Sequence, residues 1–170
     1  WALDGIPESE VERFEKSYPL DRFGIGLVAG PASNNILLVD TDSVDLEVIN
    51  LVPPSPLERI GLRGNVRPFK NTEELESSTP FSRPNKNLAI DPTGKPTEEI
   101  EVRCSGLYVA IPPTIHPDSG IAYRWKDNRI EDFNPDYLPP LLSIHIDAMA
   151  AVSTVDPAAS VNLSGVFVHP

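Results

Sequence analysis

Apolar residues in this chain gather into short runs, and polar, proline-rich stretches separate them. The clearest run is ILLV at residues 36–39, which leads directly into Asp40-Thr41-Asp42. An unbroken apolar run is typical of a strand that is covered on both faces. We therefore expect residues 36–40 to form a central strand. Residues 24–28 are predicted to form the strand before it, across turn residues that suit a hairpin or a tight loop.

The same reasoning predicts further elements. Ser9 and Glu12 have the spacing of a capping box, which predicts a helix over residues 9–18. Ser43 can cap a second helix that runs to about residue 51, where prolines end it. Alternating or apolar patterns predict two short strands about Gly64 within residues 58–70, and further strands at residues 98–103, 106–111 and 121–125.

The remaining stretches are less regular. Residues 71–97 are polar and rich in proline, serine, threonine and asparagine, which predicts a long surface loop. Residues 142–152 are predicted to form a helix and residues 161–168 a last strand. Because strands outnumber helices and the two are intermixed, the sequence predicts an α+β fold with mixed sheets and flanking helices.

Length and composition fit one domain over residues 1–170, which we expect to be a piece of a longer protein. A chain of 170 residues can bury a sizeable core, and its 19 prolines lie between the apolar runs, as stiff turns do. The single Cys104 can form no internal disulfide, which indicates a reducing, cytoplasmic setting. No apolar run approaches the length of a bilayer span, so we expect no membrane association.

The charge is strongly acidic, with 14 Lys and Arg residues against 25 Asp and Glu residues and a net charge of -11. General affinity for nucleic acid needs an excess of basic residues to neutralise phosphates. A role with nucleic acid would therefore depend on a local basic patch or on a metal ion.

Asp40 and Asp42 are the sharpest chemical feature. Side chains two residues apart on a strand point to the same face, so these two carboxylates could share one or two divalent cations. The alternative is that Asp42 or Ser43 only caps the next helix and that Asp40 is a solvated strand end. Glu101 is a second acidic candidate, with apolar residues on either side of it; its alternative is a solvent-facing strand position.

Basic residues and one histidine complete the set of candidates. Arg59, Arg63, Arg67 and Lys70 form a basic stretch that could hold phosphates, or could equally be a solvated hairpin. His116 lies in a proline-rich, rigid segment, where a structural turn histidine is the alternative to a site residue.

Several segments taken together resemble a known family. They are residues 24–30 as GIGLVAG, 36–42 as ILLVDTD, 53–70 as PPSPLERIGLRGNVRPFK, 100–125 as IEVRCSGLYVAIPPTIHPDSGIAYRW and 136–142 as DYLPPLL. Their order and spacing resemble the prim-pol domain over most of residues 20–142. This is the N-terminal bifunctional DNA primase/polymerase domain of the archaeo-eukaryotic primase superfamily, found in plasmid, phage and related replication proteins. The resemblance implies a primase-like catalytic core, and a helicase region often follows it.

The resemblance places the family's acidic triad on Asp40, Asp42 and Glu101. At the position of Glu101 the family more usually has an aspartate. It implies two Mg²⁺ or Mn²⁺ ions, a nucleoside triphosphate, and a single-stranded DNA template with a primer. The strand pair about Gly64 departs from the family because it has no nucleotide-contacting histidine. Basic residues are therefore expected to contact the triphosphate, namely Arg63, Arg67 and Lys70. Two further candidates at the rim of the site are Arg103 and His116.

Three functions follow as hypotheses. The leading one is a template-directed nucleotidyltransferase, a DNA primase, a DNA polymerase or both. The second is a catalytically inactive module of the same fold that binds DNA or a replication partner, which the missing histidine and the acidic charge motivate. The third is a metal-dependent nuclease that uses the same carboxylates.

Overall fold

The computed structural model describes residues 8–18, 24–75, 79–117 and 119–153. The helices and strands run in the order α1 (Glu8–Ser17), β1 (Ile25–Val28), β2 (Ile36–Asp42), α2 (Leu46–Ile49), β3 (Arg59–Ile60), β4 (Asn65–Lys70), β5 (Thr79–Pro84), β6 (Thr97–Arg103), β7 (Tyr108–Ile111), β8 (Arg124–Trp125) and α3 (Ser143–Ala150). Three single 3-10 turns join them, η1 (Pro31–Ser33), η2 (Ile130–Asp132) and η3 (Pro135–Tyr137).

The strands form a six-stranded sheet in the order β5-β6-β2-β4-β3-β8 and a separate pair, β1 and β7. All strand pairs in both sheets are antiparallel, so the α+β class is confirmed and the expectation of mixed sheets is wrong. The reason lies in β4. The chain crosses from β2 through α2 to β3, and β4 then turns back at Gly64 to lie between them, so that each of the two meets an antiparallel neighbour.

β2 is a central strand, as its apolar run predicts. Leu37, Leu38 and Val39 are fully buried, and β2 pairs with β4 on one side and β6 on the other. Burial of each such side chain contributes about 1.5–3 kcal/mol of transfer free energy. The run therefore fixes the strand in the middle of the domain.

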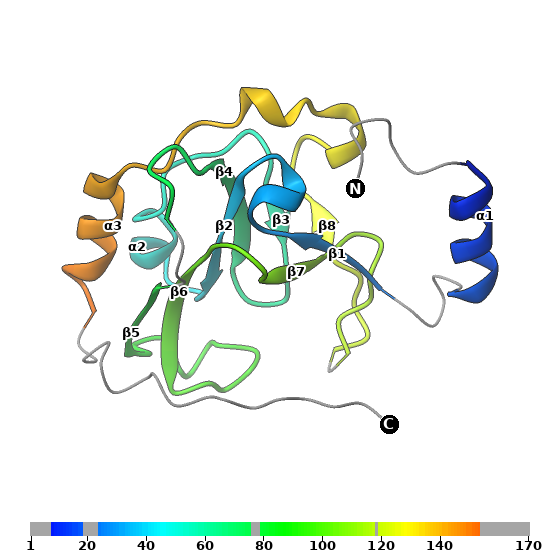
Figure 1. Cartoon of the computed structure of the whole chain (residues 1–170). Coiled ribbons are helices and arrows are strands. Elements are labelled where there is room, and N and C mark those ends of the chain that lie inside the picture. Colours follow the sequence, from blue (N-terminus) through cyan, green and yellow to red (C-terminus); the bar gives the residue numbers. More distant parts are fainter. Residues whose placement is uncertain (1–7, 19–23, 76–78, 118, 154–170) are drawn as a thin grey trace.

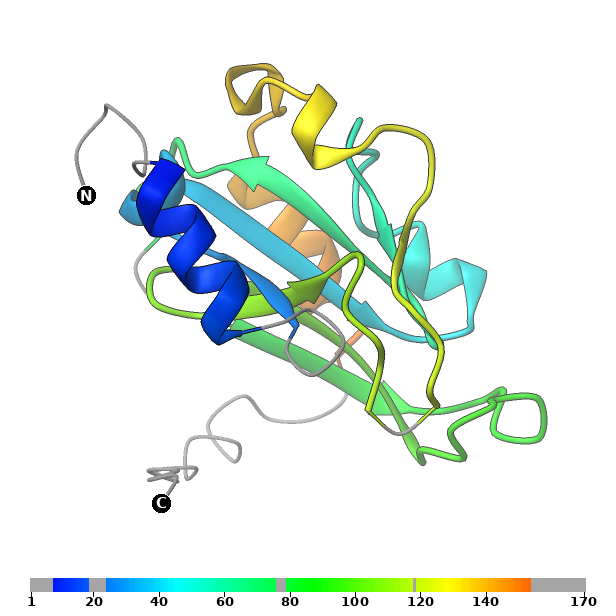
Figure 2. The same cartoon turned by 90° about the vertical axis from the view of Figure 1, so that its right-hand side faces the viewer.

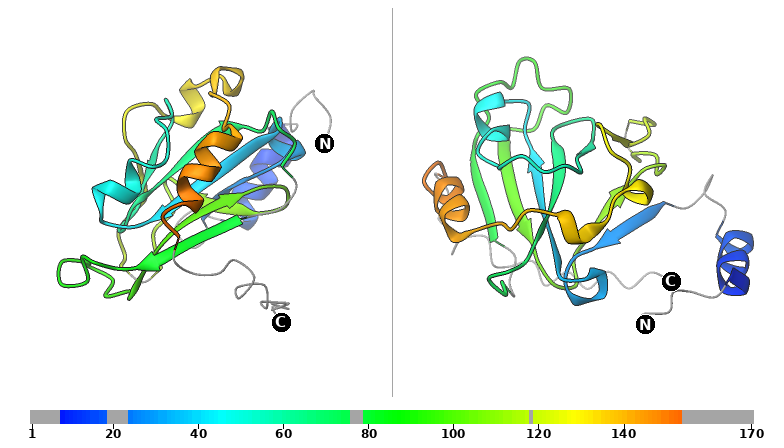
Figure 3. Two further views of the ribbon diagram at one scale, coloured as in Figure 1. Left: turned by 90° about the vertical axis from the view of Figure 1, so that its left-hand side faces the viewer. Right: turned by 90° about the horizontal axis from the view of Figure 1, so that it is seen from above.

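The two faces of β2 lie in different core clusters. Leu37 and Val39 pack with Val48 of α2 and Met149 of α3, so these two helices cover one face of the large sheet (Figure 1). Leu38 packs in a second cluster that includes residues of β1 and β7. The domain thus has three layers, with helices on one side of the large sheet and the β1–β7 pair on the other, whereas α1 stands apart beyond β1 (Figures 2 and 3).

The β1–β7 pair covers only part of its side of β2. Ile36 and Leu38 are buried in the second cluster, but Asp40 and Asp42, which continue the same face, keep 23% and 27% of their side chains exposed. The last part of β2 therefore opens to solvent on this side. The layer structure itself creates a place for a site.

Four expectations need correction or qualification. β5 lies inside the stretch expected to be a loop. It is an edge strand that pairs only with β6, where prolines and polar residues are tolerated because one side needs no partner. α2 is shorter than expected and is capped by Asp45 rather than Ser43, whose hydroxyl donates to Glu98. α1 begins at Glu8, one residue before the expected start.

The remaining expectations fall into two groups. The strand expected at 161–168 lies outside the described residues. The helix near residues 142–152 and the other expected strands are present, most with small shifts at their ends, but the strand expected at 121–125 is only β8, Arg124–Trp125. In the described ranges, none of the helices combines the length and the apolar character that a membrane crossing requires.

Candidate active site

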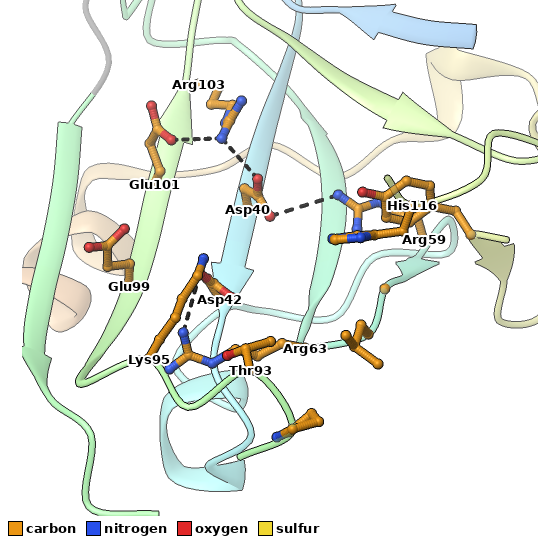
Figure 4. Close-up of a pocket in the computed structure, with 14 residues that line it drawn as sticks. Asp40, Asp42, Arg59, Arg63, Thr93, Lys95, Glu99, Glu101, Arg103 and His116 are labelled. Carbon is orange, nitrogen blue, oxygen red and sulfur yellow. Dashed lines mark hydrogen bonds and ion pairs between the residues drawn. The ribbon is translucent and has the colours of Figure 1, made fainter. Parts of the chain in front are cut away.

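Carboxylates converge on the open end of β2 because of strand register. Asp40 lies directly opposite Glu101 of β6, and Asp42 lies opposite Glu99. Opposed residues of an antiparallel pair project to the same face, so all four acids share one face of the sheet (Figure 4). Ile100, between the two glutamates, is buried in the core on the other face. Glu101 therefore lies on the same side of the sheet as the Asp40 and Asp42 pair.

Arg103 joins two of these acids. Its Nη2 lies 3.0 Å from Oδ2 of Asp40 and 2.9 Å from Oε2 of Glu101, and its Nη1 donates to the carbonyl oxygen of Tyr108 at 2.9 Å. Two facing carboxylates repel one another, and a positive charge between them relieves that repulsion. One guanidinium thus bridges Asp40 and Glu101, offsets part of their negative charge and ties them to β7.

Asp42 has its own cations. Its Oδ2 lies 3.3 Å from Nη1 of Arg63 and 2.6 Å from Nζ of Lys95. Arg63 is almost fully buried and also pairs with Asp91 at 2.7 Å, while its Nη2 donates to the carbonyl oxygen of Thr97. Burial alone would raise the pKa of Asp91, but hydrogen bonds from Thr93 and the charge of Arg63 lower it. Asp91 therefore stays ionised and holds Arg63 in place.

Gly64 explains why Arg63 can reach Asp42. Gly64 has φ of 69°, in the left-handed region, and a Cβ built on it would lie 1.8 Å from the carbonyl oxygen of Thr41. Only glycine permits such an approach between two backbones. The turn between β3 and β4 can therefore press against β2 between the two aspartates, which brings Arg63 beside Asp42.

Aromatic residues and a further arginine form the other wall. The guanidinium of Arg59 lies 4.5 Å from the centroid of the Tyr123 ring, a cation–π contact, and its Nη2 is 3.9 Å from Oδ1 of Asp40. The ring of Tyr123 in turn lies 5.6 Å from the ring of His116. His116 thus reaches the site through an aromatic contact.

The electrostatics single out Asp40. Burial raises the pKa of the Asp40 carboxyl, the charges of Arg59 and Arg103 lower it, and the neighbouring charge of Asp42 raises it, with a net increase. Burial also lowers the pKa of Arg59. The ionised form of Asp40 is thus less stable, relative to the protonated form, than that of a solvated aspartate, despite its arginine partners. Perturbed carboxyls in clefts are common at functional sites.

These groups surround a cleft of about 600 Å³. The residues that line it are Asp40, Asp42, Arg59, Gly61, Leu62, Arg63, Pro92, Thr93, Lys95, Glu99, Glu101, Arg103, His116 and Tyr123. Six of the predicted site residues are among them, namely Asp40, Asp42, Glu101, Arg63, Arg103 and His116. Acids lie along one wall and cations at both ends (Figure 4), an arrangement suited to a phosphate-bearing ligand together with a cation.

Arg67 is not brought to the cleft. It lies opposite Val39, on the other face of β2 from the aspartates. Its Nη1 donates to the carbonyl oxygens of Ile49 and Val52, and its Nη2 pairs with Glu58 at 3.2 Å. Arg67 therefore connects the segment around α2 to the sheet.

Lys70 does not reach the cleft either. It lies opposite Ile36, at the end of β2 away from Asp42. Its Nζ donates to Asp136 at 3.1 Å and to the carbonyl oxygen of Asn34 at 3.2 Å. Both contacts hold the η3 segment against the start of β2.

Sequence reasoning misses several residues of the cleft, and three of these carry a charge or an aromatic ring. Glu99 lies two residues before Glu101 on the same strand, so strand alternation could have placed it beside Glu101. Lys95 lies in the stretch expected to be a loop, and Tyr123 lies two residues before Trp125 in a segment expected only to form a strand. Nothing in the sequence around these two marks them, because contacts between distant segments bring them to the site.

The donor set fits a divalent cation such as Mg²⁺ or Mn²⁺ in its chemistry, since the acids offer only hard oxygen ligands. Among the residues that the structure describes, no three acidic, histidine or cysteine side chains converge closely enough to hold a metal ion. Asp40, Asp42 and Glu101 are instead paired with arginine or lysine. A metal ion would therefore have to compete with the protein's own cations.

Comparison with known proteins identifies the family. Neither the curated proteins nor the solved structures contain a match to this chain. The family model described as "Bifunctional DNA primase/polymerase, N-terminal" matches residues 7–141, a range that includes β1 to β8 and the whole cleft. The chain therefore belongs to the Prim-Pol family.

Proposed function

We propose that this chain is a template-directed nucleotidyltransferase that joins nucleoside triphosphates to a 3′-hydroxyl on a DNA template. Membership of the Prim-Pol family implies primase and polymerase activity. The carboxylates and cations that line the cleft support the proposal. The observation that carries the proposal is the strand register that sets Glu101 opposite Asp40, with Asp42 on the same face of the same cleft.

The acids are the proposed metal ligands. Asp40, Asp42 and Glu101 would hold Mg²⁺ or Mn²⁺. When bound, such ions favour ionisation of the attacking hydroxyl and offset the charge of the triphosphate. The protein's own part is to fix these carboxylates on two adjacent, buried strands, so that the reacting groups meet with little reorganisation.

Cations of the cleft would bind the triphosphate. Lys95 is 56% exposed, and Arg63, which is 2% exposed, pairs with Asp91 and lines the cleft, so both place a positive charge at the Asp42 end. Arg103 and His116 stand at the rim as lesser candidates. Arg67 and Lys70, which the sequence also suggests for this role, already have partners away from the cleft, so the geometry favours Arg63 and Lys95.

The test is nucleotide incorporation on a primed DNA template with Mn²⁺. We expect Asp40→Asn to lower the rate by at least about 100-fold, because a preorganised charge at the reaction centre is removed. The double variant Asp40→Ala with Asp42→Ala should be inactive. Asp147→Asn is the matched control, since Asp147 is exposed on α3, across the sheet from the cleft. Equal incorporation by the native chain and the double variant would refute the proposal.

A second candidate is a module without catalysis that binds DNA or a replication partner. The observation that favours it is that Arg103 already pairs with both Asp40 and Glu101 within the chain. Calorimetry with Mn²⁺ and a nucleoside triphosphate distinguishes the two. Tight, metal-dependent nucleotide binding that Asp40→Asn abolishes supports the enzyme, and its absence supports the non-catalytic module.

A further inference from the structure

A second hollow adjoins the cleft at Asp40. It measures about 350 Å³ and shares Asp40, Arg59, Arg103 and Tyr123 with the main cleft. Its remaining wall is the start of β7 and the residue before it: Leu107, Tyr108, Val109 and Ala110. Lys95, Arg63 and Asp42 do not line it. We name it the Tyr108 hollow. The two spaces adjoin at Asp40, and different residues line their far ends.

Tyr108 is the unusual residue of this hollow. It is 65% exposed, although its ring is large and apolar. Its backbone and its ring each have a contact with a neighbouring strand. Arg103 donates to its carbonyl oxygen, and its ring lies over Gly26 of β1, where an added Cβ would come within 3.2 Å of the ring carbon Cδ2. An exposed aromatic ring is a surface on which a nucleobase can stack.

The chemistry of the hollow suits a nucleotide. Tyrosine rings stack on nucleobases of any sequence, and arginines attract the phosphates beside them. Arg59 and Arg103 supply that charge next to Asp40, and the side-chain Nε of each is buried without a hydrogen-bond partner among the described residues. The hollow is thus lined by Tyr108, two arginines and the carboxylate proposed to act at the reacting centre.

In-line geometry decides which nucleotide belongs here. In phosphoryl transfer the attacking and leaving oxygens stand on opposite sides of the phosphorus. Lys95 and Arg63 lie at the Asp42 end, where the leaving pyrophosphate would be held under the proposed function. The attacking hydroxyl must then arrive from the opposite side of Asp40. The Tyr108 hollow opens on that side.

We propose that the Tyr108 hollow holds the 3′-terminal nucleotide of the primer strand, with its base stacked on Tyr108. This inference rests on the proposed function and assigns the primer end to a named surface. Tyr108 then sets the position of the attacking hydroxyl relative to Asp40. The incoming triphosphate occupies the main cleft.

The experiment compares DNA binding and kinetics in matched variants. Fluorescence anisotropy with a labelled primed template, without nucleotide, should show about 10-fold weaker binding by Tyr108→Ala, the order expected for one lost base stack. Tyr108→Phe keeps the ring and should bind within about 2-fold of the native chain. Tyr137→Ala is the control, because Tyr137 is 76% exposed on η3, outside both hollows. Unprimed template should bind equally well to all four chains.

Kinetics supply a second readout. Tyr108→Ala should raise the KM for primed template and leave the KM for the incoming nucleotide unchanged. Gly26→Val, whose side chain must displace the Tyr108 ring, should weaken primed-template binding in the same direction.

Three outcomes would overturn the inference: unchanged primed-template binding by Tyr108→Ala, an effect on the nucleotide KM alone, or equal loss with unprimed template. The proposed function fails by a different result, the full activity of the Asp40 and Asp42 double variant.

Discussion

Two arginine–carboxylate clusters of this domain have similar chemistry but different environments. The core cluster consists of Glu58, Arg67, Asn65 and Lys126, and the cleft cluster of Asp40, Glu101 and Arg103. In the core cluster the side chains of Glu58 and Arg67 are each 9% exposed. In the cleft cluster Asp40, Glu101 and Arg103 are 23%, 33% and 28% exposed.

The pKa shifts of the two central carboxyls have opposite directions. Burial would raise the pKa of Glu58, but bonds from Arg67, Lys126 and Asn65 lower it overall. Burial raises the pKa of Asp40, and its arginines do not fully offset that. Glu58 is therefore better stabilised as an anion in the fold than in water, and Asp40 is less well stabilised. The core cluster supports the fold, while the cleft cluster keeps a carboxylate that a further cation can stabilise.

The largest expected effect contrasts the two glutamates. Glu58→Ala leaves the buried charge of Arg67 without its partner, and we expect it to lower the free energy of unfolding by about 3–5 kcal/mol. Glu101→Ala should lower it by less than about 1 kcal/mol, since its pair is partly solvated, but should abolish nucleotide incorporation. Urea unfolding and incorporation assays on both variants measure the contrast. Similar stability losses in the two variants would break the comparison.

The two arginines give the next largest contrast. Arg67→Met removes hydrogen bonds to Glu58 and to the carbonyl oxygens of Ile49 and Val52, and should cost about 2–3 kcal/mol of stability. Arg103→Met removes the cation that competes for Asp40 and Glu101. We expect it to raise Mn²⁺ affinity about 10-fold, the effect of one charge interaction of about 1.4 kcal/mol.

Calorimetric titration with Mn²⁺ measures this affinity, and Arg129→Met is the control because Arg129 pairs with Glu131 at an exposed site outside the cleft. Weaker Mn²⁺ binding by Arg103→Met than by the native chain would mean that Arg103 supports the metal site rather than competing for it.

The pH dependence of stability should separate the clusters by sign. The pKa of Glu58 lies below its usual 4.5 in the fold, so its contribution is complete above pH 4.5 and is lost as the pH falls through the lowered pKa. The pKa of Asp40 lies above its usual 3.8, so its contribution is complete below pH 3.8 and is lost as the pH rises through the raised pKa.

Urea unfolding of the native chain, Glu58→Gln and Asp40→Asn across the acid range tests these signs. Glu58→Gln should flatten the fall in stability on acidification, and Asp40→Asn should remove a loss that accompanies rising pH. Parallel curves for all three proteins would contradict both assignments.

Local rules explain why Asp40, Asp42 and Glu101 lie on one face of the sheet. Alternation along β2 places Asp40 and Asp42 on one face, and buried neighbours orient Glu101 on β6. The same rule distinguishes Arg67 from the aspartates only once the β2–β4 register is known. Treating the basic stretch as one group therefore combined residues from opposite faces of the sheet and from its two ends.

The unpredicted parts depend on distant contacts. β5 has the composition of a loop, because an edge strand needs neither alternation nor a free N–H at every position. Lys95 reaches Asp42 from the connection between β5 and β6, over 53 residues of sequence. No periodicity in its own segment encodes that contact. Only the pairing of β6 with β2 brings it to the cleft.

The smallest expected stability effects come from two matched lysines. Lys126 is 51% exposed and lies 3.2 Å from Glu58, and Lys95 is 56% exposed and lies 2.6 Å from Asp42. Exposed ion pairs contribute little, so Lys126→Met and Lys95→Met should each change the free energy of unfolding by less than about 1 kcal/mol. Lys95→Met alone should raise the KM for the incoming nucleotide about 10-fold, because a lysine that contacts phosphate is lost. If both lysine variants left that KM unchanged, the cation at the Asp42 end would serve the fold, and the cleft cluster would differ from the core cluster only in its acids.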